Sequence, residues 1–406
     1  MEKLLNDLKK SSKYLQKIGQ KNRVNLILEI SNQIKKNIKN IIEANLIDLQ
    51  NAKSLSQAMQ NRLKFDENTI NLLCKSLEDI ANLKEVIGVI NDGWEAKSGI
   101  KIQKISIPIG NICAIYESRP NVTAEVAALC IKSANGCVLK GGKEARNTNS
   151  AIMQSINQAY ETLNLPKSVL FLDIDRSEVE KLIKMDEYLD LIVPRGGENL
   201  VKFVSQNATV PVLKHDKGVC HIYVDKSADL SKAINICVNA KCSRPSACNA
   251  AETVLIHQSI VNEFLPLLKA GLDKFDVEIF GCQKVANILP CTLANEASWD
   301  REYLDFKLNL KIVENLEEAM EHINLHSSGH SEAIISEDYS SCEQFLSLVD
   351  SACVYANAST RFSDGGEFGF GAEVGISTNK LHARGPVGLK ELTTYKYIIR
   401  GNGEIR

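Results

Sequence analysis

The sequence predicts an α/β protein whose strands form parallel sheets. Three features indicate this class: short apolar runs of strand length, helical patterns of about ten residues between them, and glycine pairs directly after two of the runs. The alternation begins at Ile112 and restarts after residues 221–225. At roughly 100–200 residues per domain, a chain of 406 residues suggests two or three domains, and we expect a boundary near Asp225.

Residues 1–90 are expected to be helical. Apolar residues recur at spacings of three and four above a polar face rich in lysine and asparagine. They are Val24, Ile27, Ile30, Ile34, Ile38, Ile41 and Ile42. The pattern predicts an amphipathic helix packed against a core, and it is too short to favour a coiled coil.

The periodicity drops to two in residues 100–109. This segment alternates isoleucine with other residues and slips once, near Lys104. Alternation of this kind is typical of an extended chain, and the slip indicates a bend. We expect a strand or hairpin here.

From Ile112 onwards the pattern is that of βαβ units. The predicted strands are 112–116, 137–140, 169–172 and 190–193, and the predicted helices are 123–134, 147–163, 177–184 and 197–205. Such units make right-handed crossovers and a parallel sheet, which binds nucleotides at the carboxyl ends of its strands.

Composition excludes several classes of protein. The chain has 48 basic and 50 acidic side chains, a net charge of −2, which argues against a dedicated nucleic-acid binder. An apolar content of 44% excludes disorder as the main state. Residues 1–7 carry acids where a signal peptide has a basic start, and no run approaches about 18 apolar residues. We therefore expect a soluble cytoplasmic protein that makes no membrane contact.

Twelve cysteines without a secretory signal indicate reduced thiols rather than disulfides. Most are expected to be small buried hydrophobic side chains, because they lie in apolar runs. Five of this kind are Cys113, Cys130, Cys137, Cys220 and Cys237.

A zinc site is the alternative interpretation for some of these cysteines. Cys237, Cys242 and Cys248 are separated by four and five residues, with His221 upstream. The intervals match no usual ligand spacing, so we expect no bound metal.

Three glycine-rich segments could contact phosphate. Gly141–Gly142 and Gly196–Gly197 each follow a predicted strand and precede a helix, where bare backbone N–H groups attract anions. Each pair could equally be a tight turn. The segment 369–375 is one residue longer than the dinucleotide fingerprint and follows a polar loop, so we expect a structural loop there.

The candidate nucleophile is Cys248. It lies between a predicted helix at 230–240 and a predicted strand at 253–257, on a loop that can face a cleft. Lys241 and Arg244 supply positive charge that would favour the reactive thiolate. Cys242 shares the loop, and spacing alone leaves it as a rival.

Long ordered motifs then indicate a family. They are YESRPNV (116–122), LKGGKEA (139–145), VPRGG (193–197), RPS and CNA within 244–250, GH and AI within 329–334, VDS (349–351), NASTRF (357–362), DGGEFG (364–369) and LHARGP (381–386). Together they span about residues 105–406 and resemble the gamma-glutamyl phosphate reductases, a family of proline biosynthesis within the aldehyde dehydrogenase superfamily.

The resemblance implies an aldehyde dehydrogenase-like fold with three parts. A Rossmann-like cofactor domain would occupy residues 1–225 and include a strand arm at 96–110. An α/β catalytic domain would occupy 226–360. Residues 361–406 would return to the cofactor domain and complete a β oligomerisation arm, so a homo-oligomer is expected.

The resemblance also implies roles for single residues. Cys248 matches the family's nucleophile, which decides against Cys242, and Ser118 matches the oxyanion-hole position. Glu302 matches the glutamate that holds the nicotinamide ribose. The expected cofactor-binding residues are Lys140, Gly141, Lys143, Pro194, Arg195, Gly196, Gly197 and Glu302.

The implied reaction is NADPH-dependent reduction of L-glutamyl 5-phosphate to L-glutamate 5-semialdehyde through a cysteine thioester. Arg119, Arg244 and Arg361 are the candidates for binding phosphate or carboxylate, because a guanidinium fork matches both anions; a structural ion pair is the alternative for each. Lys143 stands where relatives that prefer NAD carry an acid, so NADP(H) is expected. A contact with glutamate 5-kinase could pass on the acyl phosphate.

One departure concerns the substrate. Lys214 replaces an acid that the family often carries near the site. Hydrolytic aldehyde dehydrogenases have a general-base glutamate at a position that falls near Leu213 and Lys214, and the nearest acid here is Asp216.

Two alternative functions stay open. A CoA-acylating aldehyde dehydrogenase would share the fold and the cysteine, but it needs a channel for pantetheine. A non-catalytic scaffold of the same fold would tolerate loss of Cys248, and the retained thiol argues against it.

Overall fold

The computed structural model describes residues 1–55, 57–214 and 217–406. These residues form two compact units. Unit 1 comprises 1–214, 369–376 and 386–406, and unit 2 comprises 215–368 and 377–385. Each unit contains a parallel sheet, so the α/β prediction is confirmed.

The α-helices and most of the strands of unit 1 lie within its first 210 residues. Its helices are α1 (Glu2–Lys17), α2 (Gly19–Lys36), α3 (Ile38–Asn51), α4 (Gln57–Leu63), α5 (Glu67–Asn82), α6 (Asn121–Lys132), α7 (Arg146–Thr162), α8 (Arg176–Leu182) and α9 (Glu198–Asn207). Its strands are β1 (Ile90–Glu95), β2 (Lys101–Pro108), β3 (Asn111–Tyr116), β4 (Gly136–Lys140), β5 (Val169–Phe171), β6 (Leu191–Arg195) and β16 (Thr393–Arg400).

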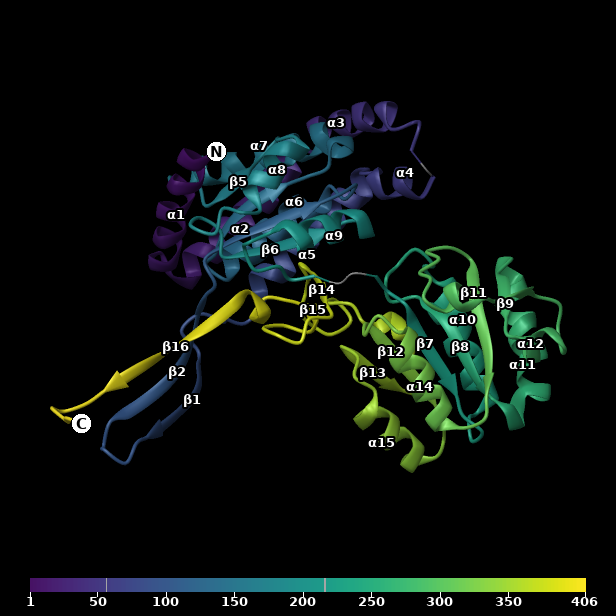
Figure 1. Cartoon of the computed structure of the whole chain (residues 1–406). Coiled ribbons are helices and arrows are strands. Elements are labelled where there is room, and N and C mark those ends of the chain that lie inside the picture. Colours follow the sequence, from purple (N-terminus) through teal and green to yellow (C-terminus); the bar gives the residue numbers. More distant parts are fainter. Residues whose placement is uncertain (56, 215–216) are drawn as a thin grey trace. The chain divides into compact units, whose positions relative to one another are not determined.

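The sheet of unit 1 has the strand order β5-β4-β3-β6, with every pair parallel (Figure 1). All four strands and the four helices α6 to α9 lie within a few residues of their predicted ranges. The chain builds outward from β3 to β4 and β5, and then returns to place β6 on the other side of β3. The crossover direction therefore changes between β3 and β6, the point where α/β sheets of this type bind ligands.

The predicted helix through residues 24–42 is wrong in one respect, because it is broken at Asn37. α2 ends at Lys36 and α3 begins at Ile38. The Asn37 side chain donates to Ser155 Oγ (3.1 Å) and Gln158 Oε1 (2.6 Å) on α7. Asparagine is a weak helix former, and its bonds to α7 fix the break.

The core on one face of this sheet joins three helices that are far apart in sequence. Leu5 and Leu8 of α1 pack with Val179 and Leu182 of α8, and Val204 of α9 completes the cluster above β3 and β4. All are buried. This packing holds the sheet, and with it the turns at the carboxyl ends of the strands.

The arm is a three-stranded antiparallel ribbon in the order β1-β2-β16. The predicted strand at 100–109 and the return of the chain at 392–400 are confirmed, whereas β1 was not predicted. The register shifts between Ile90 and Asp92, opposite Ile105 and Lys104, which is where the sequence alternation slips. A bulge in β1 therefore accounts for the predicted bend.

Unit 2 contains a larger sheet. Its helices are α10 (Leu230–Cys242), α11 (Val261–Leu272), α12 (Gln283–Ala286), α13 (Glu296–Trp299), α14 (Leu316–His326) and α15 (Tyr339–Leu348). Its strands are β7 (Cys220–Val224), β8 (Ala251–His257), β9 (Glu278–Gly281), β10 (Thr292–Leu293), β11 (Lys307–Val313), β12 (Ser331–Ile335) and β13 (Cys353–Ala356). Two further short strands, β14 (Gly375–Ser377) and β15 (Gly385–Val387), pair with each other.

The strand order in unit 2 is β10-β9-β11-β8-β7-β12-β13. This order explains why the unit boundary lies before the expected position near Asp225. β7 hydrogen-bonds β8 and β12 within the second sheet, so its residues belong to unit 2. The return of the chain also differs from the expected 361–406, because residues 377–385 remain with unit 2.

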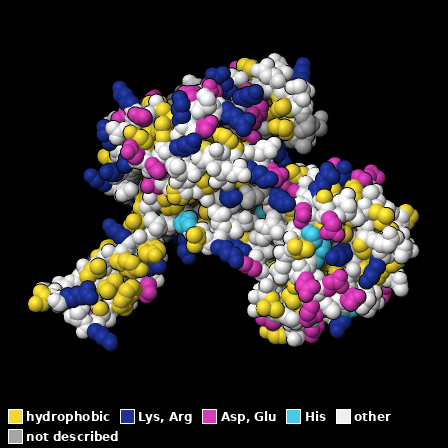
Figure 2. Space-filling view, viewed as in Figure 1, with side chains coloured by type: hydrophobic (Ala, Val, Ile, Leu, Met, Phe, Trp, Pro, Cys, Tyr) yellow, Lys and Arg dark blue, Asp and Glu magenta, His cyan; other side chains and the backbone are white. Residues whose placement is uncertain are grey.

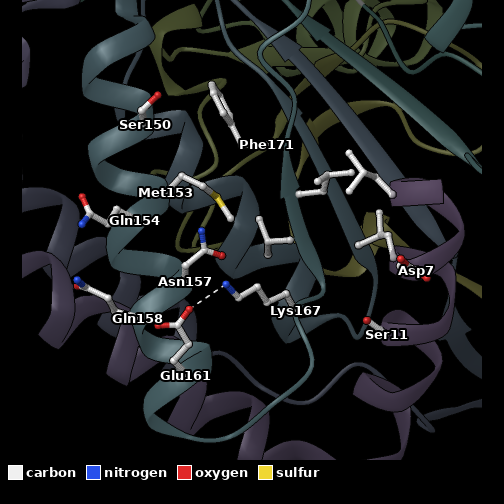
Figure 3. Close-up of a pocket in the computed structure, with 14 residues that line it drawn as sticks. Asp7, Ser11, Ser150, Met153, Gln154, Asn157, Gln158, Glu161, Lys167 and Phe171 are labelled. Atoms are coloured by element: carbon white, nitrogen blue, oxygen red, sulfur yellow. Dashed lines mark hydrogen bonds and ion pairs between the residues drawn. The ribbon is translucent and has the colours of Figure 1, made fainter. Parts of the chain in front are cut away.

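No helix among the described residues is long and apolar enough to cross a membrane. A cavity of about 790 Å³ lies in unit 1 between α1, α7 and β5, where Glu161 and Lys167 form an ion pair (Figure 3). None of the site residues predicted from the sequence lines this cavity.

Candidate active site

The glycine turns of unit 1 lie at the carboxyl ends of neighbouring parallel strands. β3 ends at Tyr116, β4 at Lys140 and β6 at Arg195. The residues that follow these strands therefore meet at one edge of the sheet, as the sequence predicts.

Neighbouring side chains lie close to three glycines of these turns. A Cβ on Gly141 would lie 2.2 Å from Asn149 Nδ2, and one on Gly142 would lie 2.1 Å from Glu144 Oε1. A Cβ on Gly196 would lie 2.4 Å from Glu117 Oε2. A side chain at any of these positions would therefore displace a neighbour, and the role of the glycines in binding phosphate stays a prediction.

Ser118 is buried in a left-handed conformation, with φ 43°. Its backbone N–H and its hydroxyl both donate to Glu144 Oε1, at 2.7 and 2.8 Å. The hydroxyl proton is thus directed at Glu144, and the oxyanion role inferred for Ser118 stays a prediction.

Glu117 is a functional candidate that sequence reasoning missed. Its backbone N–H donates to the Arg195 carbonyl (3.0 Å), and its Oε2 accepts from the Gly197 N–H (2.8 Å) at the start of α9. The carboxylate thus occupies the helix terminus at the crossover point between β3 and β6. An acid directly after a strand, opposite a glycine pair, was the available signal.

The basic residues of this edge differ in exposure. Lys143 is exposed on the short 3₁₀ turn Lys143–Ala145 that precedes α7, and Lys140 is half-buried. Arg195 lies 3.7 Å from Glu373, and a Cβ on Gly375 would lie 3.1 Å from its Cδ. Arg119 and Pro194 lie beside the ends of β3 and β6.

This set of groups fits a dinucleotide. Backbone turns without side chains, the amino end of α9, and Lys140 and Lys143 at the end of β4 supply N–H donors and positive charge for phosphate. The Glu117 carboxylate carries the same charge as a phosphate, so it would have to release the Gly197 N–H to a phosphate oxygen at that helix end.

In unit 2 the candidate residues gather at the opposite edge of the sheet. Gly218 precedes β7, Cys248 precedes β8, Glu302 lies in the loop before β11, and His330 precedes β12. These are the amino ends of the strands. The usual rule that ligands bind at the carboxyl ends of the strands in α/β sheets therefore does not describe unit 2.

Cys248 lies in the loop between α10 and β8, as predicted, and is half-exposed. Cys242 is the last residue of α10 and is 6% exposed. Burial raises the pKa of Cys242 to about 11, although Lys241 opposes the rise. A neutral buried thiol is a poor nucleophile, so the geometry favours Cys248 over its rival.

Gly218 holds this loop and was missed by sequence reasoning. A Cβ at Gly218 would lie 1.8 Å from the Cys248 carbonyl oxygen and 2.8 Å from its Cα. The Gly218 N–H donates to Glu302 Oε1 (2.9 Å), so one residue joins the cysteine loop to Glu302. A role for Glu302 toward a nicotinamide ribose stays a prediction.

Asn249 fixes the other side of the loop. Its amide donates to the Ser363 carbonyl (2.9 Å) and the Arg361 carbonyl (3.3 Å), and its own carbonyl accepts from Thr360 Oγ1 (2.7 Å). Arg361 in turn donates to Asn249 Oδ1 and to Ser243 Oγ. The motif at 357–362 is thereby tied to the motif that contains Cys248.

Arg244 and Arg361 of unit 2 lie close enough to influence each other. Burial and the neighbouring Arg244 lower the pKa of Arg361, whereas Cys248 raises it. Arg244 is exposed. An anion bound here would relieve the repulsion between the two cations, so the pair is suited to a phosphate or carboxylate.

The expectation that Lys241 favours the Cys248 thiolate stays a prediction, and the structure gives Lys241 another partner. Lys241 is fully buried, and its Nζ lies 2.7 Å from Glu252 Oε2. Burial raises the pKa of Glu252 to about 8, although Lys241 opposes the rise. Lys241 is thus paired with Glu252.

The remaining sequence expectations concern the other cysteines, a metal site and Lys214. Cys113, Cys130, Cys137, Cys220 and Cys237 are all fully buried, as predicted. No group of three potential metal ligands comes together within residues 1–55, 57–214 and 217–406. Lys214 is half-buried at the end of unit 1's first segment, and Asp216 lies outside the described residues.

Comparisons with known proteins identify relatives. Residues 1–285 match the model of the aldehyde dehydrogenase family. The chain is 51% identical over 410 residues to gamma-glutamyl phosphate reductase of Nautilia profundicola, with all of both chains covered. It also resembles the crystal structure of gamma-glutamyl phosphate reductase from Thermotoga maritima, at 44% identity and a TM-score of 0.96, over 99% of this chain and 98% of that chain.

A more distant likeness concerns the fold alone. An acetylating aldehyde dehydrogenase from Geobacillus thermoglucosidasius is 17% identical with a TM-score of 0.72, over 100% of this chain and 97% of that chain. The predicted aldehyde dehydrogenase-like fold is therefore confirmed.

Gly218→Ala is expected to abolish activity at Cys248 without unfolding the chain, because the new methyl group overlaps the backbone of the cysteine loop. Gly93→Ala on β1 is the matched control, since a Cβ there meets only ordinary contacts. Activity and far-ultraviolet circular dichroism are the measurements. Equal activity of the two variants would show that the loop tolerates displacement.

Proposed function

The chain belongs to the gamma-glutamyl phosphate reductase family of the aldehyde dehydrogenase fold, and from this premise we propose that it reduces L-glutamyl 5-phosphate to L-glutamate 5-semialdehyde and releases phosphate. One observation carries the proposal. A half-exposed cysteine lies in a loop that Gly218 and Asn249 hold rigidly, next to the Arg244–Arg361 pair.

The first step is covalent. The Cys248 thiolate attacks the acyl carbon, the bond to the phosphoryl oxygen breaks, and phosphate leaves while a thioester remains. Splitting the reaction in this way converts the carboxyl derivative into a form that accepts a hydride. The rigid loop supports this step, because a nucleophile held in one geometry avoids the entropy of positioning.

The two arginines serve the anions of the reaction. Arg244 is exposed and free to meet an incoming phosphate, whereas Arg361 is half-buried and anchored to Asn249 and Ser243. We assign phosphate to Arg244 together with Arg361, because two neighbouring guanidinium groups match the charge and the oxygens of a phosphate. Arg119 on unit 1 is the remaining candidate for the substrate carboxylate.

The family uses a nicotinamide cofactor, which when bound supplies the hydride that reduces the thioester. We propose that unit 1 binds it through the turns after β3, β4 and β6 and that unit 2 carries the covalent chemistry through Cys248. Lys140, Lys143 and Arg195 supply positive charge at the unit 1 edge.

Cys248→Ala is expected to abolish turnover while the fold is kept, because loss of a covalent nucleophile lowers the rate by several orders of magnitude. Cys242→Ala should stay active. The measurement is semialdehyde oxidation with NADP in phosphate buffer. An inactive Cys242 variant together with an active Cys248 variant would reverse the assignment.

Preference for NADP(H) is inferred from Lys143, whose exposed ammonium group can attract a 2′-phosphate. Lys143→Glu should lower the ratio of kcat/KM for NADPH to that for NADH by about tenfold or more. Lys181→Glu on α8 is the control, since Lys181 is also exposed on unit 1. An unchanged ratio in the Lys143 variant would remove this basis for the preference.

We also propose that the arm forms a homo-oligomer. It exposes an apolar surface that includes Trp94 (45%), Tyr397 (50%) and Ile399 (60%) (Figure 2). Such a surface on an antiparallel ribbon is typical of a protein interface. A cytoplasmic location and a contact with glutamate 5-kinase stay predictions from the sequence.

Ile399→Lys should weaken this assembly, because a charge would be buried in the apolar contact. Leu325→Lys is the control, since Leu325 is 75% exposed on α14 outside the arm. Mass by light scattering is the measurement. A wild-type mass equal to the 44.9 kDa of a single chain would contradict the proposed assembly.

A further inference from the structure

A buried histidine lies near the candidate nucleophile. His330 is fully buried in the turn before β12, and Cys248 lies close enough to raise its pKa. Cys220 lies behind both residues: its Sγ is 3.9 Å from His330 Nδ1 and 3.3 Å from the Cys248 carbonyl oxygen. The reaction described above uses neither His330 nor Cys220.

A string of hydroxyl groups leads away from this histidine. His330 Nδ1 lies 2.8 Å from Ser331 Oγ, which lies 2.5 Å from Ser363 Oγ, which lies 2.7 Å from the Tyr355 hydroxyl. Ser331 and Ser363 are fully buried, whereas Tyr355 is half-buried. Each hydroxyl can accept one proton and donate another, so the string can carry a proton between His330 and the surface.

The ionisable groups around the ring come from four segments. They are Cys220 on β7, Cys248 before β8, Glu302 before β11 and Glu332 on β12. Burial acts to lower the pKa of His330, but Cys248, Glu332 and Glu302 together raise it. Burial raises the pKa of Cys220 far above its ordinary value, so Cys220 remains a neutral thiol.

The two glutamates already have partners. Glu332 accepts from the His221 N–H (2.6 Å) and from Ser327 Oγ (2.5 Å), and Glu302 accepts from the Gly218 N–H. Cys248 is therefore the group near the ring whose charge changes during the reaction.

We propose that His330 is a second catalytic residue, which pairs as an imidazolium with the Cys248 thiolate and donates its proton to the departing phosphate. The proposal rests on the function proposed above. When sulfur bonds to the acyl carbon, the thiolate charge that favours the imidazolium disappears. Burial then drives the proton off the ring at the moment when the leaving oxygen needs it.

The step balances. The carbon–oxygen bond breaks with its electron pair on the phosphate oxygen, the His330 proton neutralises that oxygen, and hydrogen phosphate leaves. After the thioester has been reduced, the thiolate is released and His330 regains a proton from solvent along Tyr355, Ser363 and Ser331. One proton is taken up per turnover, as reduction of an acyl phosphate to an aldehyde and hydrogen phosphate requires.

The first test needs no substrate. The rate at which iodoacetamide alkylates Cys248 is followed against pH by mass spectrometry of the peptide that contains it. The wild-type Cys248 thiol should be alkylated at pH values well below those at which an ordinary thiol ionises. His330→Gln should slow alkylation at about pH 6.5 by about tenfold or more. His257→Gln at the other end of β8 is the control. Coincident profiles for wild type and His330→Gln would overturn the pair.

The second test separates the two roles of His330 in the reverse reaction, where it accepts the proton of the attacking hydrogen phosphate. At about pH 9.5 the thiol ionises unaided. In His330→Gln the first NADPH equivalent should then form normally, while phosphate-dependent turnover stays about 100-fold slower. Full recovery of turnover at this pH would overturn the proton-transfer role.

Ser363→Ala tests the proposal even if the His330 variant fails to fold. It interrupts the string but leaves Cys248 and His330 in place. Its alkylation profile should match wild type, while turnover falls several-fold and the solvent isotope effect rises. Wild-type turnover with an unchanged isotope effect would overturn the string. A wild-type enzyme that is inactive toward the semialdehyde would instead refute the proposed function, and the alkylation test would still stand.

Discussion

The contact between Gly218 and the backbone of Cys248 is the constraint on which the rest of the candidate site depends. It leaves no space for a Cβ, and it forces the segment before β7 against the segment before β8. Once the two backbones touch, the Gly218 N–H reaches Glu302, the Cys248 carbonyl reaches Cys220, and Asn249 reaches the motif around Arg361. A nucleophile is thereby fixed by main-chain packing, which is stiffer than any single side-chain contact.

The two units use opposite edges of their sheets. Unit 1 presents turns after β3, β4 and β6, at the carboxyl ends, where helix termini and bare N–H groups suit phosphate. Unit 2 gathers its reactive groups before β7, β8, β11 and β12, at the amino ends. The loops that lead from α10 into β8 and from α14 into β12 bring Cys248 and His330 close together. Anion binding in unit 1 thus depends on backbone N–H groups and helix termini, whereas covalent chemistry in unit 2 depends on side chains in the loops before the strands.

Much of the fold could be predicted from the sequence, because period and turn chemistry are local properties. The strands and helices of residues 111–207 follow from them, and so does the bend in the arm, where a bulge lies opposite Lys104. The break at Asn37 could not be predicted, because it depends on bonds to α7 more than a hundred residues away. The same holds for Lys241, whose partner Glu252 is visible only once α10 packs on β8. Cys248 could be predicted from its sequence motif. Gly218, Glu117 and His330 could not, because their roles depend on tertiary contacts.

The central claim is that Cys248 carries the acyl group and that phosphate, rather than water, removes it. The position of a general-base glutamate falls near Leu213 and Lys214 in the sequence, and neither is a carboxylate. The most direct measurement mixes the enzyme with glutamate semialdehyde and NADP in phosphate-free buffer and follows NADPH and the mass of the Cys248 peptide together. The account predicts a burst close to one equivalent, an acyl adduct on Cys248, and its release when phosphate or arsenate is added. Sustained NADPH formation without either anion, and an unmodified Cys248 peptide, would contradict it.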